Sequence, residues 1–264
     1  MRSSSLERKA VRAVLIPLGL PSRRRRGDVV ILCYHRVGVG NRAIDVSLPA
    51  FRRQLEVLAG TGQVRSLDDA LASPDGGVVI TIDDGYRDFI DHVLPLLSDQ
   101  GLPALLYLAT GLVLDGGRPA ESDDAMTWTM LREAAATGLV AFGSHTHGHV
   151  DLSKGSADDA EAEMRKSKEL IEDQLGVACR HFAYPWGRGS RAAEPHARTL
   201  FDTAALVGWT VNRRGAVDPY RLGRIPIQRS DGSIFFRAKT LGLLDPESPA
   251  HRASRALRRT ASRS

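Results

Sequence analysis

The chain of 264 residues contains little cysteine and no apolar run long enough to cross a membrane. Cys33 and Cys179 are the only cysteines and form no CxxC pair, which excludes a zinc ribbon and argues against a disulfide framework. Cysteines so far apart indicate reduced, buried thiols. Residues 11–20 are apolar, but Arg12 and Pro17 interrupt a segment that is already too short to span a bilayer.

Acidic residues are scarce at both ends of the chain, so the net charge of +5 is unevenly distributed. Residues 1–27 contain eight Lys/Arg and one acid, and residues 250–264 contain five Arg and no acid. These segments carry +7 and +5, which leaves −7 for the rest of the chain. An acidic body argues against nucleic acid as the main partner. We therefore divide the chain into a basic N-terminal segment (1–27), a folded domain (28–245) and a basic C-terminal tail (246–264).

The N-terminal segment lacks the order of a signal peptide, because its four arginines at 23–26 follow the apolar residues instead of preceding them. This order suits a short amphipathic helix on an anionic membrane face. A disordered basic tail would have the same composition, so both interpretations stay open. We expect a cytoplasmic protein, peripheral to the inner membrane face if the amphipathic interpretation holds.

Short apolar runs alternate with helical patterns between the two basic ends. The candidate strands cover residues 29–34, 78–83, 104–109, 139–144, 181–184, 203–207 and 225–228. Most are continuously apolar, which is typical of strands buried on both faces. The candidate helices start near Ser47, with Pro49 in the first turn, and at Ser156, whose spacing to Asp159 resembles a capping box. Others cover 86–100, 126–137 and 190–201.

Seven strands alternating with helices predict an α/β fold with a parallel sheet. About 230 residues for seven units favour a (β/α)7 barrel, and an open doubly wound sheet is the alternative. In either fold the functional site lies at the C-terminal ends of the strands.

Chemically active side chains follow several of these strands. Asp83 and Asp84 close one strand before a glycine, where an Asp is also common as a helix N-cap. The run 143–149 contains three histidines, and His145 and His149 have a spacing that binds divalent metals when the segment turns helically. Together with Asp84 they make two imidazoles and one carboxylate, which leaves open coordination positions for catalysis. A solvated His-rich loop is the alternative interpretation.

Two further segments end at the same predicted rim. The sequence Tyr184-Pro-Trp186-Gly could expose a backbone N–H for an oxyanion, although an ordinary turn with two core aromatics has the same pattern. His35 follows the first strand, and its position there favours a functional role over the structural role that a lone His more often has.

These motifs, in this order and spacing, resemble the polysaccharide deacetylase family, the carbohydrate esterase group with the NodB homology domain. The resemblance spans about residues 29–229 and implies a distorted, NodB-type (β/α)7 barrel. It implies Asp83 as catalytic base and Asp84, His145 and His149 as ligands of one divalent metal ion, with zinc favoured. His147 is not one of the motif positions. The implied activity is hydrolysis of an N-acyl group, expected to be acetyl, from an amino sugar or glycan by a metal-bound water.

The sequence departs from the family pattern in two places. The arginine of the usual Arg-Pro-Pro-Tyr-Gly motif is absent, and so is the late Leu-x-His that supplies the general acid. The early His35 resembles the circularly rearranged branch that includes poly-N-acetylglucosamine deacetylases, in which an early strand-end His serves as acid. Arg224 is our candidate to replace the arginine and orient Asp83. The N–H of Tyr184 is our candidate oxyanion donor, and Trp186 our candidate for substrate binding.

Two other function classes remain open on the sequence. A non-haem iron oxygenase also uses two His and a carboxylate, but it would need the alternating strands of a jelly roll. A non-catalytic glycan-binding descendant would explain the two lost motif residues, while the retained base and ligands oppose it. For an enzyme without an export signal, nucleotide-linked or lipid-linked amino sugars are the expected substrates.

Overall fold

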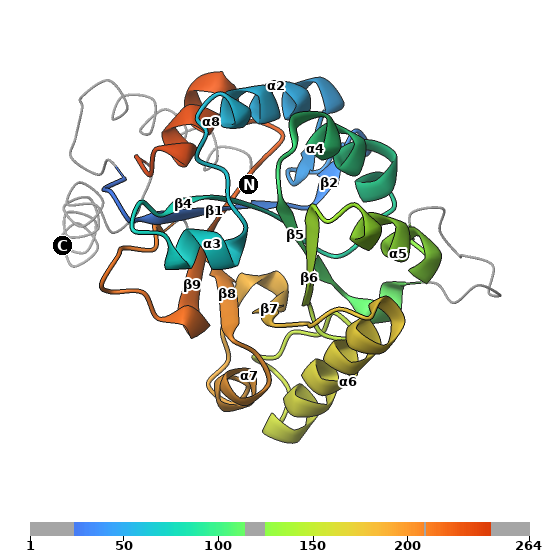
Figure 1. Cartoon of the computed structure of the whole chain (residues 1–264). Helices are drawn as coiled ribbons and strands as arrows, with labels where there is room; N and C mark the ends of the chain where they lie inside the picture. Colours follow the sequence, from blue (N-terminus) through green and yellow to red (C-terminus); the bar gives the residue numbers. More distant parts are fainter. Residues whose placement is uncertain (1–23, 114–124, 209, 244–264) are drawn as a thin grey trace, which may run out of the picture.

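Seven parallel strands close into a barrel (Figure 1). The computed structural model describes residues 24–113, 125–208 and 210–243. The barrel strands, in spatial order, are β1 (Val29–Tyr34), β4 (Gly77–Ile82), β5 (Ala104–Leu108), β6 (Val140–Ser144), β7 (His181–Ala183), β8 (Thr203–Val207) and β9 (Leu222–Pro226). Pairing of β1 with β9, which aligns Ile31 with Arg224, closes the barrel. The predicted (β/α)7 barrel is confirmed, and the open doubly wound sheet is excluded.

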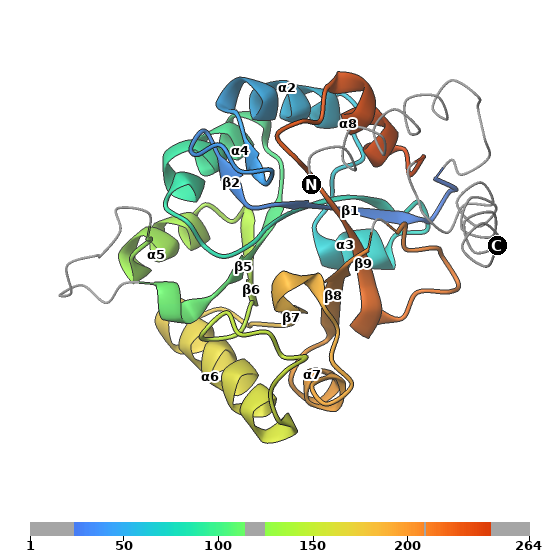
Figure 2. The same ribbon diagram turned by 180° about the vertical axis from the view of Figure 1, so that it is seen from behind.

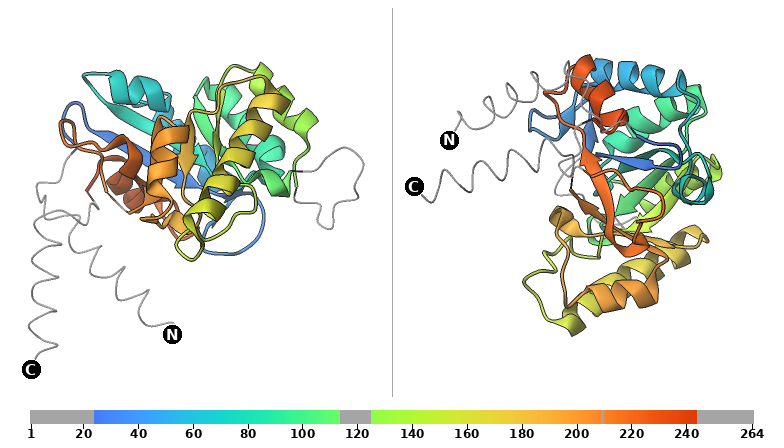
Figure 3. Two further views of the ribbon diagram at one scale, coloured as in Figure 1. Left: turned by 90° about the horizontal axis from the view of Figure 1, so that it is seen from below. Right: turned by 90° about the vertical axis from the view of Figure 1, so that its left-hand side faces the viewer.

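Helices cover the outside of the barrel (Figures 1 and 2). They are α2 (Leu48–Ala59), α3 (Leu67–Ala72), α4 (Leu94–Gln100), α5 (Trp128–Ala136), α6 (Ala157–Leu175), α7 (Glu194–Leu200) and α8 (Ser233–Thr240). Short helical turns form η1 (Phe89–Val93), η2 (Thr110–Leu112), η3 (Pro185–Gly187) and η4 (Pro219–Arg221), and β2 (Arg36–Val37) pairs with β3 (Asp45–Val46). Side views show α6 and α7 next to each other (Figure 3).

Both faces of the barrel wall are buried, which explains the continuous apolar runs in the sequence. In β1, Val30 and Leu32 pack in the outer core beneath the helices, while Val29 and Ile31 belong to the separate inner cluster. Alternate residues of a strand point to opposite faces, so each strand contributes to both cores. Cys33 and Cys179 are buried free thiols, as predicted.

Of the two predicted helix caps, one is present as predicted and one is not. The predicted capping box of α6 is present, since the Ser156 hydroxyl accepts from the Asp159 N–H and the Asp159 carboxylate accepts from the Ser156 N–H. Gly176 ends the same helix in the left-handed conformation. Ser47 precedes α2, but its side chain makes no capping hydrogen bond; the Pro in the first turn fixes this helix start instead.

Among the strands, the largest boundary error concerns the last one. β9 begins at Leu222, three residues before the predicted start, so Arg224 lies inside the strand and not before it. The segments 1–23 and 246–264, which carry the predicted basic ends, lie outside the described residues. Within the described part of the chain, no helix combines the length and apolar character needed to cross a membrane.

Candidate metal centre

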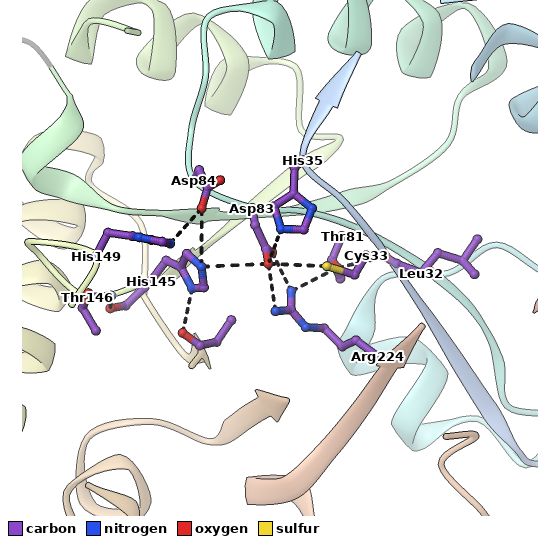
Figure 4. Close-up of polar contacts among 12 residues, drawn as sticks. Leu32, Cys33, His35, Thr81, Asp83, Asp84, His145, Thr146, His149 and Arg224 are labelled. Carbon is purple, nitrogen blue, oxygen red and sulfur yellow. Dashed lines mark hydrogen bonds and ion pairs between the residues drawn. The ribbon is translucent and has the colours of Figure 1, made fainter. Parts of the chain in front are cut away.

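Three side chains from two strand ends converge at the C-terminal end of the barrel (Figure 4). Asp84 follows β4, and His145 and His149 follow β6. One ligand atom from each lies within 4.8 Å of the other two. The Asp84 Oδ1 is 3.2 Å from Nε2 of His149 and 3.5 Å from Nε2 of His145. In a tetrahedral site with bonds of about 2.1 Å, neighbouring ligand atoms lie about 3.4 Å apart. The spacing therefore fits a single first-row divalent ion.

The protonation state of His145 also fits a bound cation. The Nδ1 of His145 lies 2.7 Å from the carbonyl oxygen of Ala183, which can only accept, so Nδ1 carries the proton and Nε2 keeps a lone pair available for a metal ion. Burial lowers the pKa of His145, which favours the neutral imidazole that a metal binds. The buried Asp84 Oδ1 has no well-aligned hydrogen-bond donor among the described residues. A cation would compensate that buried, charged oxygen.

Backbone strain is concentrated at this centre. Four described residues other than glycine have a left-handed backbone: Asp84 (φ 75°), Thr146 (φ 66°), His149 (φ 53°) and Trp186 (φ 60°). Each such residue costs about 1–3 kcal/mol and persists only where the surroundings impose it. Two of the four are candidate metal ligands and the other two lie beside them, so the strain marks a functional site.

A buried ion pair lies next to the ligand cluster. The guanidinium of Arg224 donates to both carboxylate oxygens of Asp83, at 2.5 Å from Nη1 and 2.8 Å from Nη2. Burial, the largest single influence, would raise the pKa of Asp83, but the Arg224 charge and hydrogen bonds together with the nearby His145 and His35 hold that pKa well below its usual range. Asp83 is therefore an ionised carboxylate with a fixed orientation. Arg224 reaches it from inside β9, on the opposite side of the closing seam.

The inner surface of the barrel supports this pair through residues that sequence reasoning missed. Tyr107 places its ring 5.1 Å from the Arg224 guanidinium carbon, and the Thr81 hydroxyl lies 3.4 Å from Nη1 of Arg224. The Cys33 thiol donates to Oδ2 of Asp83 at 3.4 Å. In the sequence these residues look like ordinary strand positions. Their only signal in the sequence is their position in β1, β4 and β5, where alternate residues point into the barrel.

His35 faces the same carboxylate. Its Nε2 lies 3.9 Å from Oδ2 of Asp83, an oxygen that Nε2 of His145 also approaches at 3.9 Å (Figure 4). The His35 side chain is 20% exposed, so it contacts both the buried centre and the open mouth. His147, the competing histidine, instead pairs its Nδ1 with the Thr110 hydroxyl at 3.0 Å and does not belong to the ligand cluster.

The predicted oxyanion donor, the N–H of Tyr184, is already engaged in the sheet. The N–H of Tyr184 donates to the carbonyl of Ala205 at 3.0 Å, because the residue before a proline stays extended and continues the β7–β8 pairing. Its ring packs edge-on against Phe182 in the outer core. Trp186 follows Pro185, which has no N–H, and within the described residues no hydrogen bond from its own N–H is found. The Pro-aromatic-Gly order could have identified Trp186 as the first free donor of this turn.

Trp186 also has the exposure expected of a substrate contact. Its side chain is 66% exposed, an unusual exposure for the largest apolar residue, and its ring centroid lies 5.4 Å from that of His149. An indole held beside a candidate metal ligand offers a flat apolar face at the mouth of the site.

Known proteins share both this fold and this sequence pattern. Residues 71–201, about half of the chain, match the family model described as polysaccharide deacetylase. The putative polysaccharide deacetylase YxkH of Bacillus subtilis is 26% identical over 167 residues, covering 60% of this chain and 56% of the relative. The poly-beta-1,6-N-acetyl-D-glucosamine N-deacetylase of Staphylococcus epidermidis is 26% identical over 163 residues, covering 58% and 55%. The chain thus spans little more than half the length of these curated relatives.

Among solved structures, IcaB from Ammonifex degensii is 27% identical with a TM-score of 0.70, covering 81% of this chain and 97% of that chain. The deacetylase PplD of Streptococcus pyogenes shares the fold, with a TM-score of 0.72 at 24% identity over 82% of this chain and 99% of that chain. The barrel, the motif order and these matches define the class of the protein. The chain belongs to the polysaccharide deacetylase family, in its NodB-type carbohydrate esterase group.

Proposed function

We propose that the protein is a metal-dependent hydrolase that removes the N-acetyl group from an amino sugar or glycan. One observation carries this proposal: Asp84, His145 and His149 converge beside an ionised Asp83 at the mouth of the barrel. The names of the curated relatives support a carbohydrate N-deacetylase as the activity.

Asp84, His145 and His149 would hold one divalent ion, with zinc favoured by the nitrogen and oxygen donors and by a reaction without redox steps. When bound, such an ion polarises a carbonyl oxygen and lowers the pKa of a coordinated water toward about 7. The carbonyl of Ala183 fixes the ring of His145 for this purpose.

Asp83 acts as the general base in this proposal. It accepts a proton from the water that attacks the amide carbon. The two hydrogen bonds from the Arg224 guanidinium keep the carboxylate ionised and correctly oriented. The N–H of Trp186 is our proposed donor to the developing oxyanion, since Tyr184 is engaged in the sheet.

His35 completes the reaction as the general acid. The amide C–N bond breaks only when its nitrogen gains a proton, because an unprotonated amine is a poor leaving group. Protonated His35 gives that proton, and the products are the free sugar amine and acetate. His35 suits the role because its Nε2 approaches the same Asp83 oxygen as His145 does and its side chain is partly open to solvent.

The structure weighs against the two alternatives named above. An iron oxygenase would need a jelly roll, and the strands here form a parallel barrel. The missing motif arginine had favoured a non-catalytic descendant, but Arg224 supplies a guanidinium to Asp83 from another strand.

The decisive experiment measures acetate and free amine released from N-acetylated sugars. The full chain is stripped with a chelator, reloaded with zinc, and assayed on N-acetylglucosamine oligomers and on nucleotide-linked and lipid-linked N-acetyl sugars. We expect release that disappears on chelation and returns with zinc. The control variant Asp83→Asn should retain metal and lose turnover. Release that persists in the stripped protein would contradict the proposal, and a metal-loaded chain inactive on every substrate would favour the non-catalytic alternative.

A further inference from the structure

The two described ends of the chain meet at the N-terminal end of the barrel. The N–H of Arg24 donates to the carbonyl of Leu241, just after α8, at 3.0 Å. Residues 1–23 join the fold at Arg24 and residues 244–264 continue from Leu243. These two segments carry formal charges of +4 and +3. Both basic segments of the sequence are therefore attached to the fold at one place.

The folded surface around this junction is also basic. We define the basic pole as the six arginines next to the junction: Arg24, Arg25, Arg26, Arg65, Arg213 and Arg214. Three consecutive arginines lead into β1, and the Arg214 side chain reaches the carbonyl of Pro74 from the other side. A hollow of about 400 Å³ lies among the arginines at positions 24–26 and 65, with Gln63 and Asp75.

Two carboxylates belong to the same pole, and each already has an arginine. Asp28 is buried and accepts from Arg213 at 2.7 Å, and Asp75 accepts from Arg26 at 2.5 Å. Six arginines against two aspartates leave a formal charge of +4 on the folded pole. The excess does not extend around the whole rim, because Arg180 lies between Asp68 and Asp202 further along the same end.

The basic pole lies at the opposite end of the barrel from the candidate metal centre. Arg26 precedes β1, whereas Asp84 and His145 follow the ends of β4 and β6. All barrel strands are parallel, and Val29 pairs with Gly77 at one end of the β1–β4 ladder while Tyr34 pairs with Ile82 at the other. Six residues of strand separate the two ends by about 20 Å.

We propose that the basic pole docks on the anionic face of a lipid bilayer and holds the barrel with its metal-centre mouth turned toward the water. Guanidinium groups bind phosphate in a bidentate manner, and clustered basic residues attract anionic lipid surfaces. The apolar residues 11–20, flanked by arginines in the segment attached at this pole, favour a bilayer over a nucleic acid. The docking does not depend on the proposed deacetylation.

Co-sedimentation of the full chain with vesicles tests the docking. We expect binding to phosphatidylcholine vesicles that contain phosphatidylglycerol and none to phosphatidylcholine alone. Binding should weaken steeply as salt rises, because the screening length shrinks to about 8 Å at physiological ionic strength. Equal binding to neutral vesicles would contradict an electrostatic pole. Tighter binding to double-stranded DNA than to anionic vesicles at the same salt would assign the pole to nucleic acid.

A charge-matched pair of variants locates the surface. The triple variant Arg25→Ser, Arg26→Ser, Arg65→Ser should bind anionic vesicles at least about tenfold more weakly, since each substitution removes a positive charge that attracts the lipid phosphates. The control variant Arg52→Ser, Arg132→Ser, Arg165→Ser removes the same charge from exposed helix positions away from the pole. Equal weakening by both variants would show that only net charge matters and would overturn the assigned surface.

The orientation is tested with the exposed Trp186 at the mouth. The fluorescence of Trp186 is obtained by subtracting the spectrum of the Trp186→Phe variant from that of the wild type, with both proteins bound to anionic vesicles. We expect that difference signal to be quenched by acrylamide in the water and to be unaffected by nitroxide-labelled lipids. Quenching by the labelled lipids would place the mouth against the bilayer and refute the orientation.

Discussion

The two ends of the barrel hold their charges in different ways. At the C-terminal end, Arg224 and Asp83 are both almost completely buried and meet across the closing seam. At the N-terminal end, Arg180 is half-exposed and lies between two exposed aspartates. Buried charges are costly unless they are paired, whereas exposed pairs contribute little. In our proposal the buried pair serves catalysis, while the exposed charges fit solubility and surface binding.

His35→Gln should give a large loss of turnover at the C-terminal end while leaving the three metal ligands intact. Turnover should fall by about 10²–10⁴, the usual range for the loss of a general acid, because the amine then leaves without a positioned proton donor. Steady-state kinetics on the substrate identified by acetate release, together with metal content, measures this. Near-normal turnover would remove His35 from the mechanism and return His147 as the candidate.

Arg224→Met should give the largest loss of stability in this comparison. Removing the guanidinium leaves the carboxylate of Asp83 buried without its partner, and breaking such a pair costs about 3–5 kcal/mol. Urea unfolding followed by circular dichroism measures the change in the free energy of unfolding. A loss below about 1 kcal/mol would mean that Asp83 finds another partner.

Tyr107 should show a smaller effect that depends on its ring and not on its hydroxyl. The ring lies against the Arg224 guanidinium, and the hydroxyl is buried with no partner found in the described residues. Tyr107→Phe should leave stability unchanged or slightly raised, since it removes an unsatisfied polar group. Tyr107→Leu should cost about 2 kcal/mol in unfolding free energy. If Tyr107→Phe lowers the unfolding free energy as much as Tyr107→Leu does, the hydroxyl contributes to stability in a way that the structure does not show.

Arg180→Ala should give the smallest effect, at the opposite end of the barrel. Its two ion pairs are exposed, so their loss should cost less than about 1 kcal/mol of unfolding free energy. The same urea experiment measures it. A loss of unfolding free energy as large as that of Arg224→Met would show that the exposure of an ion pair does not determine its contribution to stability at the two ends of the barrel.

The sequence predicted the elements whose signals are local. Seven apolar runs, separated by helical patterns, were sufficient for the barrel, and β1 and β8 have the predicted bounds. The position of Asp84, His145 and His149 after their strands followed from the motifs. α3 and α8 were missed because helices of six and eight residues are too short for a clear apolar period.

The missed features depend on contacts between distant residues. A charged residue inside an apolar run looks like the end of a strand, so β9 was predicted to begin after Arg224. The charge is tolerated inside the strand because the guanidinium pairs with the carboxylate of Asp83. Tyr184 was chosen as the oxyanion donor because the pairing of β7 with β8 cannot be read from either strand alone. The inward-facing Tyr107 became visible only when the barrel brought it to Arg224.

Metal retention tests the central claim most directly. The purified wild type and the variants Asp84→Ala and His145→Ala are each incubated with zinc, desalted, and analysed for metal per chain. We predict one tightly held ion in the wild type and loss of the retained ion in both variants, because each variant removes one of only three protein ligands. A fully occupied site in either variant would contradict the assignment of this cluster as the metal centre.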